Sequence, residues 1–190
     1  MKRVFHFLAI IIVLPTWLLV WLEKKFNLGI RMYVLWAQFW ALVPGIVGSF
    51  CRRAYYSLIF PDVSLDCEIG FGTFFSQPWG VIEKGVYIGP YCILGNVILR
   101  EGSLIASRVS IPSGKRQHRR SKDGKILPAD LSHFEKVEIG PHAWIGEGAI
   151  VMASVGEKAT VAAGAVVTRR VPPGCVVAGN PARILRRESY

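Results

Sequence analysis

Residues 139–185 read IGPHAWIGEGAIVMASVGEKATVAAGAVVTRRVPPGCVVAGNPARIL, and an aliphatic residue opens one six-residue step after another. The same step extends back to Val63. Its inward positions are Ile69, Ile82, Ile88, Leu94, Ile105, Ile111, Ile139, Ile145, Val151, Val155, Val161 and Val167. This period is neither helical nor a simple alternation. It predicts short strands stacked as a solenoid, with three steps to each triangular turn. Gly follows many of these aliphatic residues, and we expect it to let the chain bend at the corners.

The repeat has breaks, which we interpret as corners and as one insertion. The step from Phe75 to Ile82 is one residue longer than the six-residue period, and the step from Leu94 to Leu99 is one residue shorter. Between Ile111 and Val137 the pattern vanishes. A loop of this length in a compact solenoid is either functional or disordered. We therefore place an inserted loop at about 113–136.

The repeat, together with the VVTRRVPPGCVVAGNPARIL ending, resembles the hexapeptide-repeat acyltransferases, and most of all the sugar and xenobiotic O-acetyltransferases. The resemblance covers roughly residues 61–187. It implies a mainly β fold, a left-handed parallel β-helix, over residues 61–190. It also implies a homotrimer with its sites between neighbouring subunits, and a functional role for the inserted loop.

Acyl transfer to a hydroxyl needs a base near neutral pH, and histidine titrates there. His118 lies in SGKRQH, at the start of the inserted loop, and matches the position of the family's catalytic histidine. The resemblance implies that His118 takes the proton from a sugar hydroxyl as that oxygen attacks the thioester, without a covalent enzyme intermediate. His133 remains an alternative because the loop could fold it back. A plain solvated role for His118 also stays open.

The resemblance implies acetyl-CoA as the acyl donor and no metal. The positions that match the family's coenzyme contacts are Glu147, Ala163, Thr168, Arg169, Arg183 and Arg186. Arginine suits phosphate through its fork of donors, although the C-terminal arginines could also form a solvated tail. Glu147 stands where the family has a small residue, which puts a side-chain contact at that position in doubt.

On the acceptor side, Gln77 and Trp79 in FFSQPWG lie roughly where related enzymes bind the acceptor. An aromatic ring beside an amide suits a sugar, but corner packing explains the pair equally well. Basic residues crowd the inserted loop. They could meet coenzyme phosphates, an anionic glycan, a lipid-linked pyrophosphate, lipid headgroups or only solvent, and they are Lys115, Arg116, Arg119, Arg120, Lys122 and Lys125.

The first 60 residues differ from the repeat and form a separate, membrane-associated segment. Val4–Leu22 and Met32–Phe50 each run without a charged residue and approach the length of a membrane-spanning helix. We expect two hydrophobic helices. They could form a hairpin with both ends cytoplasmic, lie in the membrane interface, or be buried in a soluble core. Basic residues at every border give no clear orientation.

Composition excludes several other classes of protein and site. The formal net charge is +10 and 52% of residues are hydrophobic, so a disordered basic tail is excluded. The bases show no nucleic-acid reading motif, so no nucleic-acid partner is expected. The four cysteines are scattered, which fits neither a zinc site nor a disulfide framework.

Together these features predict a membrane-anchored O-acetyltransferase. Its acceptor would be a sugar hydroxyl of a cell-surface polysaccharide or of its lipid-linked precursor, and membrane lipids would be its other partner. The location would be the bacterial inner membrane, with the catalytic domain facing the cytoplasm. The alternatives are a xenobiotic acceptor, a longer acyl donor, or a non-catalytic β-helix scaffold.

Overall fold

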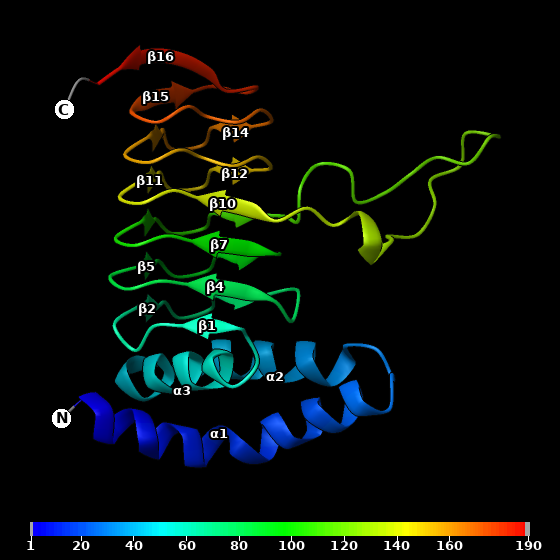
Figure 1. The fold of residues 1–190 in the computed structure, drawn as a ribbon, viewed down its shortest axis with the longest axis vertical. Coiled ribbons are helices and arrows are strands. Elements are labelled where there is room, and N and C mark those ends of the chain that lie inside the picture. Colours follow the sequence, from blue (N-terminus) through cyan, green and yellow to red (C-terminus); the bar gives the residue numbers. More distant parts are fainter. Residues whose placement is uncertain (1, 189–190) are drawn as a thin grey trace.

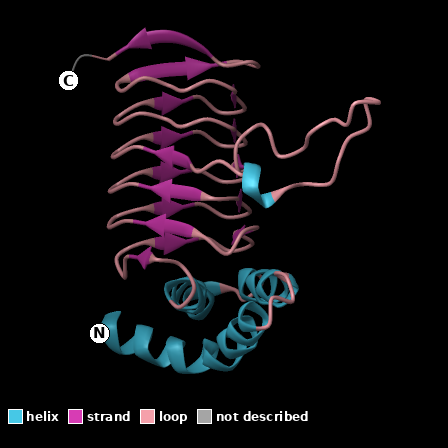
Figure 2. Cartoon of the chain, turned by 45° about the vertical axis from the view of Figure 1, so that its right-hand side comes forward, coloured by secondary structure: helices cyan, strands magenta, loops and turns pink. Residues whose placement is uncertain are grey.

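A stack of short strands stands on a layer of helices in the computed structural model, which describes residues 2–188 (Figure 1). The helices of the described chain are α1 (Lys2–Lys25), α2 (Arg31–Ala41) and α3 (Gly45–Ser57). We call these three helices the helical cap. The solenoid follows from β1 to β16, and the inserted loop leaves it sideways between β9 and β10 (Figure 2).

Three sheets form the sides of the solenoid. Sheet A contains β1 (Asp62–Val63), β4 (Gly80–Ile82), β7 (Val97–Leu99) and β10 (Val137–Ile139). Sheet B contains β2 (Glu68–Ile69), β5 (Tyr87–Ile88), β8 (Leu104–Ile105), β11 (Trp144–Ile145), β13 (Thr160–Val161), β15 (Cys175–Ala178) and β16 (Arg183–Arg187). Sheet C contains β3 (Phe74–Phe75), β6 (Ile93–Leu94), β9 (Ser110–Ile111), β12 (Ile150–Val151) and β14 (Val166–Val167).

Neighbouring strands come from successive coils and pair in parallel, except for β16, which turns back antiparallel on β15. In sheet B, for example, Ile88 lies opposite Ile69 on one side and Ile105 on the other. Every inward aliphatic position predicted from the repeat is buried, with at most 2% of its surface exposed. The predicted solenoid is therefore confirmed, and stacking places one column of aliphatic side chains behind each sheet.

The glycines that follow the aliphatic residues have a different role from the one expected. Gly89, Gly140 and Gly146 do not have a positive φ, so they are not there to allow a bend. A Cβ on Gly140 would lie 2.5 Å from the backbone nitrogen of Glu157, and one on Gly146 would lie 2.5 Å from that of Ala163. These positions need glycine because the next coil's backbone passes directly over them.

The second apolar run forms two helices, not the single helix expected. The chain leaves α2 at Leu42 and re-enters a helix after Pro44, whose extended backbone caps α3. At 1.5 Å per residue, α2 and α3 are about 17 Å and 20 Å long. Both are shorter than the bilayer's hydrocarbon core of about 30 Å. Within residues 2–188, α1 alone has the length and apolarity to cross a membrane.

Helix α1 lies flat beneath α2 and α3, across the end of the solenoid (Figures 1 and 2). Its inner stripe has the three-and-four spacing of a packed helix face and comprises His6, Ala9, Val13, Thr16, Val20 and Glu23. The opposite side is apolar and exposed: Val4 is 62% exposed, Phe7 62%, Ile11 53% and Leu18 47%. We call this side the outer face of α1. The expectation of helices buried in a soluble core does not fit it.

Arg52 fastens the cap to the first coil. Its guanidinium is 2% exposed, and its Nε donates a hydrogen bond to the carbonyl oxygen of Ile69 at 2.9 Å. Its Nη1 donates to the carbonyl oxygens of Val43 at 2.7 Å and of Trp40 at 3.2 Å. The side chain of Arg52 thus bonds carbonyl oxygens at the C-terminal end of α2 and one carbonyl oxygen of β2 in the solenoid.

Candidate functional site

The edge where sheet C turns into sheet A gathers most of the predicted site residues. The β3–β4 corner carries Gln77 and Trp79, the inserted loop replaces the β9–β10 corner, and Thr168 and Arg169 follow β14. Because successive coils stack, these corners lie above one another along one edge of the solenoid. We call it the loop edge. The repeat alone placed these residues in separate steps, and the fold aligns them.

The lower part of the loop edge joins the predicted acceptor corner to the base of the inserted loop. The Nζ atom of Lys136 lies 3.8 Å from the ring centroid of Trp79, a cation–π contact. The backbone nitrogen of Glu135 donates to the carbonyl oxygen of Ser113 at 3.0 Å, which closes the loop's base. Trp79 is half-buried, so part of its ring is available to a ligand.

The upper part of the loop edge holds predicted coenzyme residues. The Nζ atom of Lys115, at the start of the loop, donates to the carbonyl oxygen of Thr168 at 3.4 Å. Next to Thr168, a cavity of about 300 Å³ is lined by Arg169, Arg170 and Arg183 together with apolar residues of the last coils. Three arginines line this cavity, and the guanidinium group suits a phosphate-bearing ligand.

His118 lies on the inserted loop with an exposed ring. Its Nδ1 atom is 3.0 Å from the carbonyl oxygen of Leu127. A carbonyl oxygen only accepts hydrogen bonds, so Nδ1 carries the proton in this contact, and in the neutral ring Nε2 then holds the lone pair. This is the tautomer that a general base requires.

His133 has a different environment. It lies in the short 3-10 helix η1 (Leu131–His133), with its Nε2 atom 3.6 Å from the Oδ2 atom of Asp130. Hydrogen bonds from Ser132, with smaller contributions from His133 and Arg119, lower the pKa of Asp130. Arg119 also pairs with this carboxylate at 3.1 Å. The Nε2 atom of His133 therefore faces a carboxylate of its own loop.

Three predicted coenzyme residues lie away from the loop edge. Glu147 and Ala163 occupy the neighbouring edge, between sheets B and C, where the backbone nitrogen of Gly164 bonds the carbonyl oxygen of Glu147 at 2.8 Å. The carboxylate of Glu147 pairs with Arg108 at 3.2 Å. Arg186 lies on β16 and pairs with Glu188. Sheet C alone separates the two edges, so its outer face connects them.

No hydrogen bond or ion pair within residues 2–188 joins His118 to the acceptor residues or to the coenzyme residues. The loop projects away from its own solenoid (Figure 2). It also exposes apolar side chains, with Ile126 65% exposed and Leu131 60% exposed. Within one chain, the candidate residues therefore do not come together in a single closed pocket.

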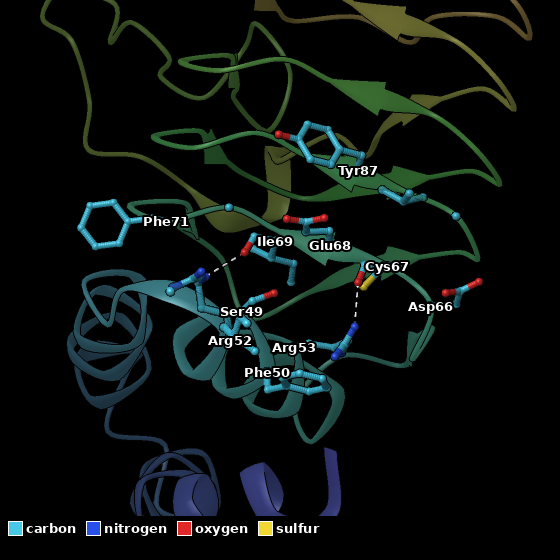
Figure 3. Close-up of a pocket in the computed structure, with 15 residues that line it drawn as sticks. Ser49, Phe50, Arg52, Arg53, Asp66, Cys67, Glu68, Ile69, Phe71 and Tyr87 are labelled. Carbon is cyan, nitrogen blue, oxygen red and sulfur yellow. Dashed lines mark hydrogen bonds between the residues drawn. The ribbon is translucent and has the colours of Figure 1, made fainter. Parts of the chain in front are cut away.

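Another cavity lies between α3 and the first coils and measures about 630 Å³ (Figure 3). None of the predicted site residues lines it. Arg52 and Arg53 border it, but their guanidinium groups bond the carbonyl oxygens of Ile69 at 2.9 Å and of Cys67 at 2.8 Å. These arginines hold the cap to the solenoid, so the cavity does not have the features of the reaction site.

Metal ligands are not grouped anywhere in the described chain: residues 2–188 contain no set of three or more His, Cys, Asp or Glu side chains placed to hold an ion. All four cysteines are free and buried.

Comparison with known proteins identifies the family. Over 146 residues the chain is 30% identical to the putative lipopolysaccharide biosynthesis O-acetyl transferase WbbJ of Escherichia coli strain K12, and the match covers 66% of this chain and 74% of WbbJ. The chain belongs to the hexapeptide-repeat, left-handed β-helix acetyltransferases.

Other relatives of the family match over shorter stretches or in fold alone. The putative acetyltransferase YJL218W of Saccharomyces cerevisiae is 37% identical over 59 residues, which is 30% of either chain. A galactoside acetyltransferase solved in complex with coenzyme A shares the fold with a TM-score of 0.60 and 17% identity, over 83% of this chain and 80% of that one. No protein-family model matches the chain.

Sequence reasoning missed two residues of the loop edge. Arg170 lines the cavity with Arg169 and Arg183, and its position directly after Arg169 was the available signal. Lys136 covers Trp79 although 56 residues separate them along the chain. No local sequence pattern predicts the contact between Lys136 and Trp79, because it depends on how many coils lie between the two residues.

Proposed function

We propose that the protein is a membrane-bound O-acetyltransferase that moves the acetyl group of acetyl-CoA to a sugar hydroxyl, with His118 as the general base. The observation that carries the proposal is the ring of His118, whose Nδ1 donates to Leu127 and whose Nε2 is left as the acceptor. Membership of the acetyltransferase family supports the donor and the reaction class.

The reaction needs one proton to move twice. Nε2 of His118 takes the proton of the acceptor hydroxyl as that oxygen attacks the thioester carbonyl carbon. The tetrahedral oxyanion then collapses and the carbon–sulfur bond breaks. The imidazolium returns the proton to the departing thiolate, so that free coenzyme A and the acetyl ester leave a neutral histidine.

The two ends of the loop edge supply the partners. Trp79 and Gln77 offer a ring face and an amide to a sugar, and Arg169, Arg170 and Arg183 surround a cavity that suits the coenzyme phosphates. Glu147 and Ala163 would lie beside the coenzyme's amide-bearing arm if it crosses sheet C. We propose that Thr168 and Arg186 contact its nucleotide end.

A second copy of the chain would complete the site. The loop projects from its own solenoid and exposes Ile126 and Leu131, and the outer side of sheet B exposes Leu104 and Trp144. Apolar surface of this kind on a β-solenoid is typical of contact between subunits. We propose a homotrimer in which His118 of one subunit serves a coenzyme bound partly by the next.

The outer face of α1 supports the location. Its apolar side chains are exposed, and α1 also carries exposed basic residues near both ends, namely Arg3, Lys24 and Lys25. Such a surface suits the interface of an anionic membrane. We propose that the protein lies on the cytoplasmic side of a bacterial inner membrane, where a polysaccharide precursor would be its acceptor.

The test is mass spectrometry of products after incubation of the full chain with acetyl-CoA and bacterial glycans. The wild-type protein should add an acetyl group, and His118→Ala should lower the rate by about 10²–10⁴-fold, the contribution of a general base. His133→Ala is the matched control on the same loop and should retain the rate. Unchanged turnover in His118→Ala would contradict the proposal.

A further inference from the structure

An apolar slot of about 250 Å³ lies between the helical cap and the corner that carries Gln77 and Trp79. Its walls come from α1, the start of α2, the residues after α3 and the corner itself. The side chains that shape it are Trp17, Val20, Trp21, Ile30, Ile59 and Pro78. No predicted coenzyme residue lines it.

The slot is lined both by α1, whose outer face is proposed to meet the membrane, and by the proposed acceptor corner. Trp21 of α1 lines it and is 42% exposed. Pro78 also lines it and lies in sequence between Gln77 and Trp79. Tyr33 is a third lining residue, and its hydroxyl is 2.9 Å from the carbonyl oxygen of Phe75 and 2.7 Å from that of Gln77. This hydroxyl holds the acceptor corner against α2.

Two lysines lie at the slot. Lys24 lines it, and the Nζ atom of Lys25 lies 4.9 Å from the ring centroid of Trp21, another lining residue. Glu23 also lines the slot; it is 5% exposed and accepts hydrogen bonds from the backbone nitrogens of Met32 at 2.8 Å and Tyr33 at 3.2 Å. The carboxylate of Glu23 is thus engaged by backbone donors at the start of α2.

We infer that the slot holds the hydrocarbon chain of a sugar acceptor linked to lipid through phosphate. The hydrocarbon would fill the slot, the phosphate would follow it at Lys24, and the sugar would continue past Pro78 to Gln77 and Trp79. The inference rests on the proposed acetyl transfer at the membrane and narrows its acceptor to the lipid-linked class. A free glycan would make no use of an apolar slot lined by the helical cap.

The test uses a farnesyl phosphate that carries a photoreactive diazirine, with the full chain bound to neutral phosphatidylcholine vesicles. We expect saturable labelling of peptides that contain slot residues, competed by farnesyl phosphate and not by inorganic phosphate. Ile59→Trp, which fills the slot, should lower labelling at least about tenfold, the effect of no longer burying about two methylene groups. Pro78→Trp fills the slot from the opposite wall and should act alike if Ile59→Trp fails to fold.

Leu18→Trp is the matched control, because Leu18 lies on the same helix as Trp17 but on the outer face. It should leave labelling of the slot unchanged. Lys24→Gln should weaken labelling by the phosphate probe but not by the corresponding farnesol probe. Labelling that is spread along the outer face of α1, or that survives both slot-filling variants, would overturn the inference.

The binding test contains neither acetyl-CoA nor a glycan. Loss of slot binding with acetyl transfer intact would therefore refute the lipid-linked acceptor alone. Saturable slot binding without any acetyl transfer would refute the proposed function instead.

Discussion

The helical cap and the solenoid are both rich in apolar residues, but they use them differently. In the solenoid the inward aliphatic side chains are at most 2% exposed. In α1 only one stripe is buried, and Phe7, Ile11 and Leu18 keep between 47% and 62% of their surface exposed. The solenoid thus buries its inward aliphatic columns, and α1 leaves one whole apolar face exposed for a contact outside the chain.

Charge follows the same division. Arg100 in the solenoid is bracketed by Glu83 at 2.8 Å and Glu138 at 2.6 Å, so its charge is used within the fold. The exposed bases of the cap, Arg3 and Lys24 among them, stand at the ends of an apolar helix face. The comparison indicates a solenoid core held by contacts within the chain and a helix face suited to meet a surface.

The largest effect is expected when one carboxylate is placed in each region, which tests whether the apolar residues of both regions are needed for folding. Ile105→Asp should unfold the solenoid, because a buried unpaired charge costs more than about 5 kcal/mol. Ile11→Asp, on the outer face of α1, should leave thermal unfolding within a few degrees of wild type. Circular dichroism melts compare the two variants.

The same pair separates folding from membrane binding. Ile11→Asp should lower flotation with anionic vesicles by about tenfold, since an isoleucine side chain no longer enters the membrane. If Ile11→Asp unfolds the protein as Ile105→Asp does, α1 would be part of a buried core and the comparison would fail.

A smaller effect is expected where the two regions join. Arg52→Ala removes the donors to the carbonyl oxygens of Ile69 and Val43, and each buried unsatisfied group costs about 1–3 kcal/mol. We therefore expect a loss of about 3 kcal/mol in the free energy of unfolding, measured by denaturant titration. Burial lowers the pKa of Arg52, yet the guanidinium stays charged at neutral pH.

Arg31→Ala is the control, because Arg31 is an exposed arginine of the same cap. It should change stability by no more than about 0.5 kcal/mol. Equal effects of the two substitutions would mean that the cap and the first coil are not held together by Arg52.

The solenoid could be predicted from the sequence because its repeat is local. Each coil needs one inward aliphatic residue per side, so the local repeat predicts the inward positions of Ile69, Ile88 and Ile105. The reason for the glycines was not visible. Gly140 and Gly146 lie under the backbone of the next coil, and that contact exists only after stacking.

The cap was harder to predict because its turns depend on contacts from other elements. Pro15 lies inside α1 without ending it, whereas Pro44 precedes a new helix. Both interrupt an apolar run in the sequence. The difference lies in the carbonyl oxygens around Val43, which Arg52 bonds from the next helix. No pattern within Met32–Phe50 reveals that bond.

The candidate site was predicted in its parts and not in its arrangement. His118, Trp79 and Arg169 could each be named from local motifs. The alignment of Trp79 and Arg169 along one edge follows from the coil count. His118 lies on the inserted loop, which Lys115 and Lys136 attach to that edge at its two ends. Glu147 matched the family pattern poorly, and it lies on the neighbouring edge paired with Arg108.

The membrane role of the cap depends on how α1 lies, which nitroxide labels at two outer-face positions would measure. Val4→Cys and Leu18→Cys replace exposed residues that lie about 21 Å apart along the helix. The native cysteines should not compete for the label. All four are buried, and burial raises the pKa of the Cys67 thiol to about 11, so little thiolate is present at neutral pH.

Depth-dependent quenching of these two labels in anionic vesicles tests the central claim most directly. A cap that rests on the membrane surface predicts that both labels lie just below the headgroups at the same depth. Depths that differ by about 20 Å would show that α1 crosses the bilayer. That result would contradict the account, because the flat packing of α1 beneath α2 and α3 would then be lost on binding.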